Sequence, residues 1–232
     1  MLKTHQWIKI QENIAQRVIL KDDFDEIKYI AGVDVAFDKS YAYGAVVVFD
    51  CKHLKMVDFA MAKCRIPFPY IPTFLSFRET KPIKMAYQKL KVKPDIILCD
   101  GQGIAHPRKA GIAVILGVNL NLPSIGVAKS KLCGVSREPN KKKGSFSFLF
   151  YNGKKVGIVL RTQKEVKPLF ISPGHKITIG TARKIVMRCV KKFRNPEPLR
   201  LAHILSKMCK NQTYSNLKIL LQNYSNSSYL FD

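Results

Sequence analysis

The stretch that decides the fold runs from residue 29 to residue 66 and reads YIAGVDVAFDKSYAYGAVVVFDCKHLKMVDFAMAKCRI. It holds three apolar, valine-rich runs, at 29–37, 43–50 and 56–66, which are joined by short polar links. Apolar runs of this length with short connections are typical of β-strands joined as hairpins. We therefore expect an antiparallel meander of three strands in this part of the chain.

The pattern changes after the meander. PDIILCD (94–100) is almost wholly apolar and predicts a strand buried on both faces, and PSIGVAK (123–129) predicts a second one. Residues 144–162 predict a hairpin that turns at Asn152-Gly153, and residues 168–174 a short strand or extended loop. Helices are expected at 5–20, from Pro82 to about residue 90, after Pro107, at 178–193 and at 197–209. This order predicts an α/β fold with a mixed sheet flanked by helices.

The charge of the chain indicates its partner. Among 232 residues there are 40 Lys and Arg against 16 Asp and Glu, a formal net charge of +24. Such an excess is typical of proteins that bind a polyanion, with nucleic acid the first candidate and an anionic membrane surface the second. No apolar run is long enough to span a membrane, and the first residues do not resemble a signal peptide. The six cysteines form no Cys-x-x-Cys pair, so we expect a reducing, cytoplasmic location and no zinc ribbon.

Because acidic residues are few, their positions are informative. Asp34 lies among small residues inside the first predicted strand, and Asp100 ends the apolar run IILC just before Gly101. Glu79 stands just before the helix predicted to begin at Pro82. For Asp34 or Asp100 taken alone, a salt bridge or a turn cap is an equally good interpretation. For Asp58, an outward-facing strand position is favoured over a functional one.

Several carboxylates that converge in a polycationic protein indicate a divalent metal held against a phosphodiester. Mg²⁺ prefers hard oxygen ligands and keeps bound water, which can act as a nucleophile. Bulk positive charge provides affinity for the backbone, and the acidic group provides the metal site. This combination favours a nuclease over a passive nucleic-acid-binding protein.

Other residues that could serve the site are less specific. The glycines of DGQGIAHPRKAGIA (100–113) would let the backbone approach a base or phosphate closely. His106 lies in the same stretch, Lys129 ends GVAK, and His175 follows a Pro-Gly pair. Taken alone, each histidine is explained as well by a cap or a hydrogen-bonded loop position.

The segment CRIPFPYIPTFLSFRET (64–80) combines three prolines with four aromatic residues. Proline fixes φ and removes a backbone donor, so this segment does not form the interior of a sheet or helix. Tyr70 and Ile71 would lie at the tip of a stiff loop. Such a loop either plugs the core or acts as a wedge against a partner.

Six stretches occur in an order and at a spacing that resemble the endonuclease V family, the deoxyinosine 3′ endonucleases. They are AGVDVAF, FPYIPTFLSFRE, PDIILCDGQGIAHPRKAGIA, PSIGVAKSKLCG, VGIVLRT and ISPGHKI. The resemblance covers residues 5 to 209 and implies an RNase H-like fold. It also implies a role in DNA repair or in cleavage of inosine-containing RNA. The implied reaction is hydrolysis, with Mg²⁺ or Mn²⁺, of the second phosphodiester bond 3′ to a deaminated adenine, leaving 3′-hydroxyl and 5′-phosphate ends.

The resemblance also implies roles for individual residues. Asp34, Glu79 and Asp100 would hold the metal and water, His175 would serve near the metal or the attacking water, and Lys129 would hold the scissile phosphate or offset its charge. The loop Pro69-Tyr70-Ile71-Pro72 would separate strands. The remaining matches are the positions around a pocket for the flipped hypoxanthine: Leu75, Gly101, Gly103, Gly111 and Leu132. His106 falls at a family histidine with a possible auxiliary role.

We expect a single catalytic domain over residues 1–210, a polar tail over 211–232 and a monomer that binds inosine-containing nucleic acid, with no membrane partner. Two alternatives remain: a structure-selective nuclease of the same fold, and a nucleic-acid-binding protein with an inactive site. The preference for DNA or RNA does not follow from the sequence.

Overall fold

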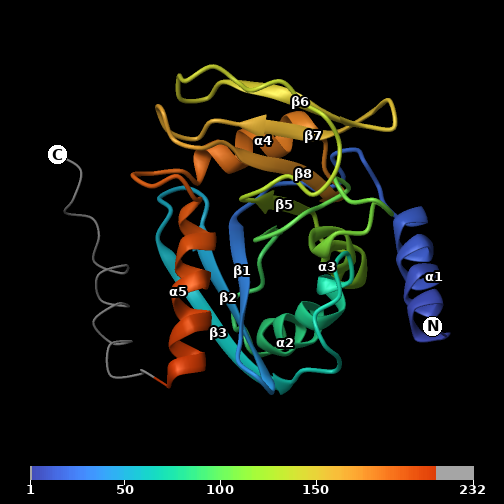
Figure 1. The fold of residues 1–232 in the computed structure, drawn as a ribbon. Helices are drawn as coiled ribbons and strands as arrows, with labels where there is room; N and C mark the ends of the chain where they lie inside the picture. The colour runs from blue at the N-terminus through green and yellow to red at the C-terminus, as the bar shows by residue number, and fades with distance from the viewer. Residues whose placement is uncertain (1, 213–232) are drawn as a thin grey trace.

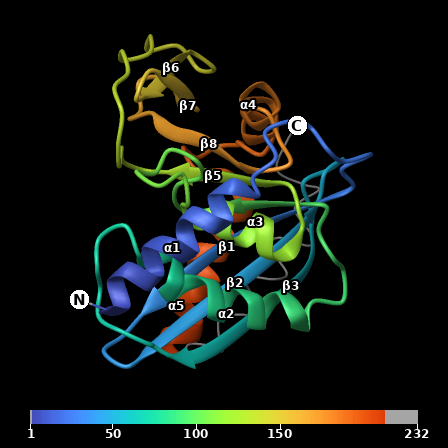
Figure 2. The ribbon, with the colours of Figure 1, turned by 90° about the vertical axis from the view of Figure 1, so that its right-hand side faces the viewer.

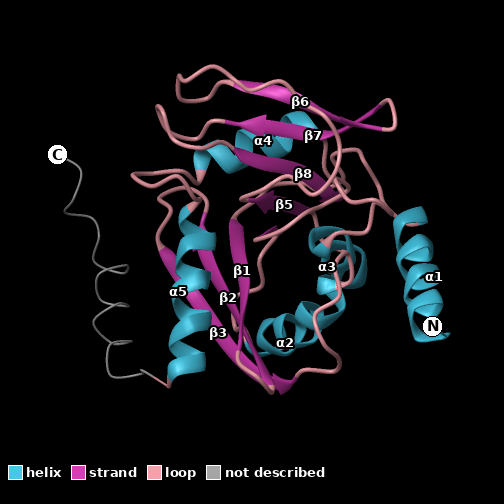
Figure 3. Cartoon of the chain, viewed as in Figure 1, coloured by secondary structure: helices cyan, strands magenta, loops and turns pink. Residues whose placement is uncertain are grey.

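The computed structural model describes residues 2–212, so most of the predicted tail, from residue 213 onward, lies outside the described residues. The strands are β1 (Tyr29–Phe37), β2 (Tyr41–Asp50), β3 (Met56–Arg65), β4 (Ile96–Cys99), β5 (Ser124–Ala128), β6 (Phe146–Tyr151), β7 (Lys154–Leu160) and β8 (Leu169–His175). The helices are α1 (Leu2–Gln16), α2 (Leu75–Lys89), α3 (Ile112–Leu120), α4 (Ile179–Arg188) and α5 (Glu197–Asn211). The predicted α/β class is confirmed (Figure 3).

All eight strands form one mixed sheet in the order β3-β2-β1-β4-β5-β8-β7-β6. The first three strands pair antiparallel, as the meander predicts. β4 lies parallel to β1 on one side and to β5 on the other. β8, β7 and β6 then continue the sheet in antiparallel pairs. The carboxyl ends of β1, β4 and β5 therefore lie at the same edge of the sheet.

Helices cover both faces of the sheet (Figures 1 and 2). On one face, residues of α4 and α5 such as Ala182, Val186 and Leu205 share a hydrophobic core with Ile125 and Ile158. On the other face, α2 and α3 pack over β1 to β4 in a second core. A third cluster joins α1, α3 and the β6–β7 hairpin. With apolar side chains buried on both faces, the central strands read as the continuous apolar runs seen in the sequence.

The prediction that Pro82 begins a helix is wrong. The helix α2 begins at Leu75 and contains Pro82 in its interior. Pro82 is buried against β2, where a Cβ on Gly44 would lie 2.6 Å from the Pro82 carbonyl carbon. A proline deletes one helical hydrogen bond, and the close packing of α2 on the sheet at Gly44 supports the helix there. As a consequence, Glu79 lies on the helix and not in the loop before it.

No helix among residues 2–212 is long and apolar enough to cross a membrane.

Candidate active site

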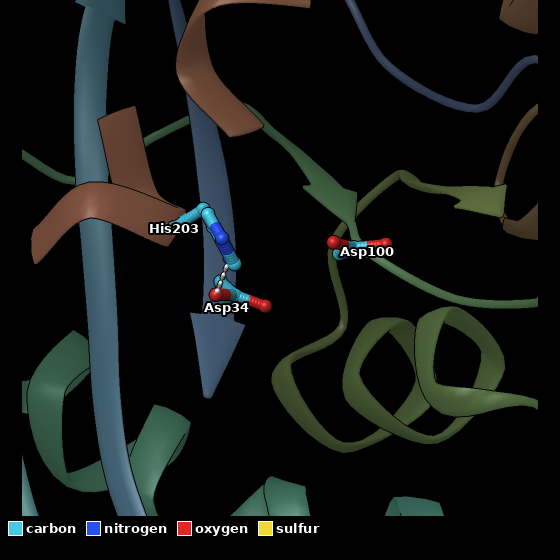
Figure 4. Close-up of side chains that lie close together, drawn as sticks. All are labelled: Asp34, Asp100 and His203. Atoms are coloured by element: carbon cyan, nitrogen blue, oxygen red, sulfur yellow. Dashed lines mark hydrogen bonds and ion pairs between the residues drawn. The ribbon is translucent and has the colours of Figure 1, made fainter. Parts of the chain in front are cut away.

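Two carboxylates meet at the carboxyl edge of the sheet because β1 and β4 are parallel neighbours. In their register, Val33 pairs with Cys99, so Asp34 and Asp100 are the next residue on each strand. Figure 4 shows the two side chains facing a common space. The sheet register therefore brings together two acids that lie 66 positions apart in the sequence.

The helix α5 brings two further polar groups to the same place. The Nδ1 atom of His203 lies 3.0 Å from the Oδ2 atom of Asp34, and the Ser206 hydroxyl donates to that same oxygen at 2.8 Å. Potential ligand atoms of Asp34, Asp100 and His203 all lie within 4.8 Å of one another. His203 was not among the site residues predicted from the sequence. A polar stripe of His203, Ser206, Lys207 and Lys210, spaced like one face of a helix, is the signal that identifies it.

Glu79 approaches the two aspartates from α2 and lines the same cleft. Burial is the main cause that raises its pKa well above the usual range, and the charges of Asp34 and Asp100 raise it further. Negative charges that raise the pKa of a buried carboxyl lie close to it without full compensation. A cation at this place would remove that penalty.

Lys129 follows β5 and donates a hydrogen bond to Asp100. Burial raises the pKa of Asp100, while the hydrogen bond and charge of Lys129 oppose that rise. The side chain of Lys129 is nearly half exposed, so it is accessible to a negatively charged ligand. Lys129 thus lies beside the acidic group at the mouth of the cleft.

The residues present fit a hard divalent cation. The oxygens of Asp34 and Asp100, with Glu79 beside them, are ligands that Mg²⁺ and Mn²⁺ accept, and the imidazole of His203 adds a nitrogen atom within reach of the same place. The buried Glu79 beside two aspartates, with its pKa raised by burial and by their charges, is an observation of this structure that favours a cation.

A second cleft, of about 360 Å³, adjoins the acidic group on the side of α2 and α3. Glu79, Asp100 and Lys129 line both clefts. Four of the five residues predicted for a base pocket line the second one: Leu75, Gly101, Gly111 and Leu132. We call it the base cleft from here on.

Gly103, the fifth, does not line the base cleft. Its N–H donates to the hydroxyl of Ser172 at 2.7 Å, and a Cβ at this position would overlap the carbonyl oxygen of Pro173 on β8. Gly103 therefore allows the loop after β4 to pack on β8. The expectation that it shapes the pocket wall directly does not agree with its position.

The proline-rich loop is exposed where the wedge interpretation requires it. Tyr70 is 62% exposed and lines the base cleft, and Pro69 and Pro72 are also exposed. Ile71 is half-buried. The alternative of a core plug is wrong for Tyr70, because most of its side chain lies in solvent.

The loop is anchored at Thr73, whose backbone has φ of 67°, in the left-handed region that β-branched residues rarely adopt. Its carbonyl oxygen accepts from the Gln11 amide at 2.8 Å and lies 3.1 Å from Nε2 of His106. The guanidinium of Arg108 donates to the Thr73 hydroxyl at 2.5 Å. A strained residue is kept in place by such surrounding bonds.

His106 is buried and acts within this anchor. Its Nδ1 accepts from the Arg108 backbone N–H at 3.2 Å, so the proton belongs on Nε2, which donates to Thr73. Burial lowers the pKa of His106 to about 4, and the charge of Arg108 adds to that effect. His106 also lines the base cleft, so it links the cleft wall to the loop.

His175 does not lie with the carboxylates. It pairs with Ser124 at the first residue of β5, whereas Lys129 follows the last residue of that strand. Its Nδ1 accepts from the Ile19 backbone N–H at 3.3 Å, and its ring is buried. The expectation that His175 serves near the metal is not met, because the register of β8 sets it at the opposite end of β5.

Comparison with known proteins gives a consistent result. The sequence pattern of the endonuclease V family matches residues 12–204. The chain is 46% identical over 204 residues to Endonuclease V of Dictyoglomus turgidum, covering 88% of this chain and 90% of that protein. The crystal structure of Endonuclease V from Streptomyces avermitilis superposes with a TM-score of 0.86 at 36% identity, covering 90% of this chain and 93% of that one. Endonuclease V of Ciona intestinalis, in complex with a 24mer DNA containing an inosine followed by a ribo-adenosine, gives a TM-score of 0.78 at 28% identity, covering 93% and 99%.

Proposed function

The chain belongs to the endonuclease V family, and from this membership we propose that it hydrolyses the second phosphodiester bond 3′ to inosine or deoxyinosine, leaving 3′-hydroxyl and 5′-phosphate ends. The observation that carries the proposal is that the carboxylates of Glu79 and Asp100 line both clefts. A base in the base cleft leaves the adjoining backbone over the carboxylates. Cleavage then falls in the backbone on the 3′ side, one nucleotide beyond the recognised one, and not at the glycosidic or sugar atoms of that nucleotide.

In the proposed reaction Asp34, Asp100 and His203 hold Mg²⁺ or Mn²⁺, with Glu79 close by. A cation held there would stabilise negative charge on the phosphate and make a coordinated water more acidic. Ser206 and His203 orient Asp34 through their contacts with its Oδ2 atom. Lys129 exchanges its bond with Asp100 for one with the phosphate and offsets the charge that develops there.

In this proposal, the nucleic-acid strand continues from the carboxylates along α5. The cleft on that side is also lined by Lys207 and Lys210, whose charges attract the phosphates beyond the cleaved bond. The base cleft lies on the α2 and α3 side. The nucleic acid thus crosses the carboxyl edge of the sheet from one face to the other.

Recognition of the base relies on backbone groups and shape. Gly101 and Gly111 line the base cleft and allow the base to approach the main chain. Hypoxanthine presents an acceptor at its 6-oxo group, where adenine presents a donor, so a fixed N–H distinguishes the two. Guanine adds a 2-amino group that a close wall excludes. Tyr70 fills the gap that the extracted base leaves.

The test is a cleavage assay on matched DNA and RNA strands that carry one inosine, with adenine strands as controls. We expect a single cut one nucleotide beyond the inosine, in Mg²⁺ or Mn²⁺ and not in excess EDTA, with a phosphate on the 5′ end of the product. Cleavage at junctions without inosine would favour a structure-selective nuclease. Tight binding with no cut in any metal would favour an inactive binding protein.

A further inference from the structure

The edge strand β6 carries a row of exposed aromatic residues outside both clefts. Phe146 and Phe148 are each 39% exposed, and Val135, in the loop that pairs with β6, is 70% exposed. With Phe150 these residues form a surface that we call the aromatic edge. β6 is the last strand of the sheet, so the aromatic edge lies at the rim of the molecule (Figure 1).

The four side chains lie on the same face of the sheet. Phe146, Phe148 and Phe150 alternate along β6, and Val135 exchanges two backbone hydrogen bonds with Phe150, of 2.8 and 2.9 Å. Leu149 points to the opposite face, where it is buried. The aromatic edge is therefore one continuous apolar strip.

This strip is not an extension of the core. On the neighbouring strand β7, Ile158 and Leu160 pair with Phe148 and Phe146 and are buried in the core to which α4 contributes. The helix α4 packs mainly on β7 and β8, and its Arg183 lies over the Phe146 ring at 4.6 Å. Beyond β7, Phe146 and Phe148 remain 39% exposed even though Arg183 of α4 lies over the first of them.

Positive charge surrounds the rings. Besides Arg183, the ammonium of Lys155 lies 4.4 Å from the centre of the Phe148 ring. The segment from residue 129 to residue 160 holds eight Lys and Arg residues and one acid, Glu138, which pairs with Arg161. Aromatic faces beside cations are the combination that binds unpaired nucleic acid, since bases stack on the rings and phosphates pair with the cations.

The aromatic edge is also continuous with the catalytic edge. Phe146 pairs with Leu160, Leu160 with Leu169, and Phe170 with Ala128, the residue before Lys129. Phe146 thus lies at the same end of the sheet as Lys129. The loop after Lys129 passes the rim of the base cleft at Leu132 and reaches the strip at Val135.

We propose that the aromatic edge binds an unpaired stretch of nucleic acid outside the inosine, by base stacking on Phe146 and Phe148 with Lys155 and Arg183 at the phosphates. The occupant is single-stranded DNA or RNA. The proposal that this occupant is part of the strand being cleaved rests on the proposed function. The proposal that the aromatic edge binds single strands does not depend on it.

The test measures anisotropy of labelled single strands without inosine, against strands of equal length in which the outer bases are abasic. For wild-type protein we expect tighter binding of the strand with bases. Phe146→Ala with Phe148→Ala is expected to weaken that binding about fivefold or more while leaving the abasic strand unchanged. Phe148→Tyr keeps the ring and is expected to bind like wild type. Val57→Ala, a change at a 43% exposed residue on the opposite edge strand β3, is the matched control.

Equal affinity of wild type and the double variant for the strand with bases would overturn the proposal. So would a self-association in sedimentation that the double variant abolishes while its nucleic-acid affinity is unchanged, because the strip would then be a protein interface. If the double variant melts early, Lys155→Gln and Phe148→Tyr take its place, with a loss expected for the first and none for the second. Cleavage of inosine strands is measured separately, so that a failure of the proposed function is seen in wild type without any reference to β6.

Discussion

His203 on α5 contacts Asp34 on β1, with 3.0 Å between Nδ1 and Oδ2, although 169 positions separate them in the sequence. Because of this contact, the histidine of the candidate site is one that α5, the last described helix, contributes. It also links the acidic group to the Lys207 and Lys210 side of the cleft, because these residues share α5 with His203.

His203→Ala is expected to lower the cleavage rate about a hundredfold or more, with little change in melting temperature, because His203 is partly exposed and touches the carboxylates. His175→Ala is expected to lower the melting temperature and to change the cleavage rate little, since His175 is buried and accepts a hydrogen bond from the Ile19 N–H. Cleavage rates and melting curves of the two variants decide the assignment. A fully active and stable His203→Ala protein would contradict the assignment of His203 to the active site.

Asp34→Asn and Asp100→Asn are expected to abolish cleavage and to retain binding of inosine strands. Each change removes a negative ligand of the candidate metal site, whereas affinity depends mainly on Lys and Arg contacts with phosphate. The measurement is cleavage in Mg²⁺ and Mn²⁺ beside binding in EDTA. Near wild-type turnover of either variant in both metals would contradict the metal-site assignment, and Asp58→Asn serves as the control at a carboxylate that binds the Lys91 and Val92 backbone N–H groups.

The sequence predicted the strands well and the start of α2 poorly, for a physical reason. Strands that are buried on both faces can be recognised in the sequence as continuous apolar runs, and IILC at 96–99 is an example. The position of Pro82 within α2 depends on its contact with Gly44 on β2, which no local pattern records. Tertiary packing there outweighs a local preference.

The candidate site was predictable to the same extent. Both aspartates were predicted as site residues, and they meet because Asp100 follows the last residue of β4 while Asp34 lies at the matching position on the parallel strand β1. His175 and Gly103 were misplaced because the register of β8, and not their neighbours in sequence, decides what they touch. His203 was missed because a single histidine in a helix resembles any polar surface residue.

The free energy of unfolding is expected to fall as the pH falls from about 6.5 to about 4. In that window the unfolded chain protonates His106, whose usual pKa is about 6.5, while the folded protein keeps the imidazole neutral with a pKa of about 4. The upper limit of this contribution is about 3 kcal/mol. His106→Gln keeps a donor for the Thr73 carbonyl and does not titrate, so its unfolding energy should change less with pH. Parallel denaturant titrations at several pH values measure the difference, and identical pH profiles would contradict the assignment.

Tyr70→Ala is expected to slow cleavage of duplex inosine DNA more than cleavage of the same single strand. Extracting a base costs a few kcal/mol in a duplex and less in a single strand. Stacking of one aromatic ring on a neighbouring base returns roughly 1–3 kcal/mol, so the loss should reach about tenfold on the duplex. Because Tyr70 is 62% exposed, the melting temperature of the Tyr70→Ala protein should stay close to that of wild type. Tyr70→Phe keeps the ring and is expected to behave like wild type. If Tyr70→Ala slows the two substrates equally, the loop does not separate strands, and its contribution is limited to lining the base cleft beside Leu75.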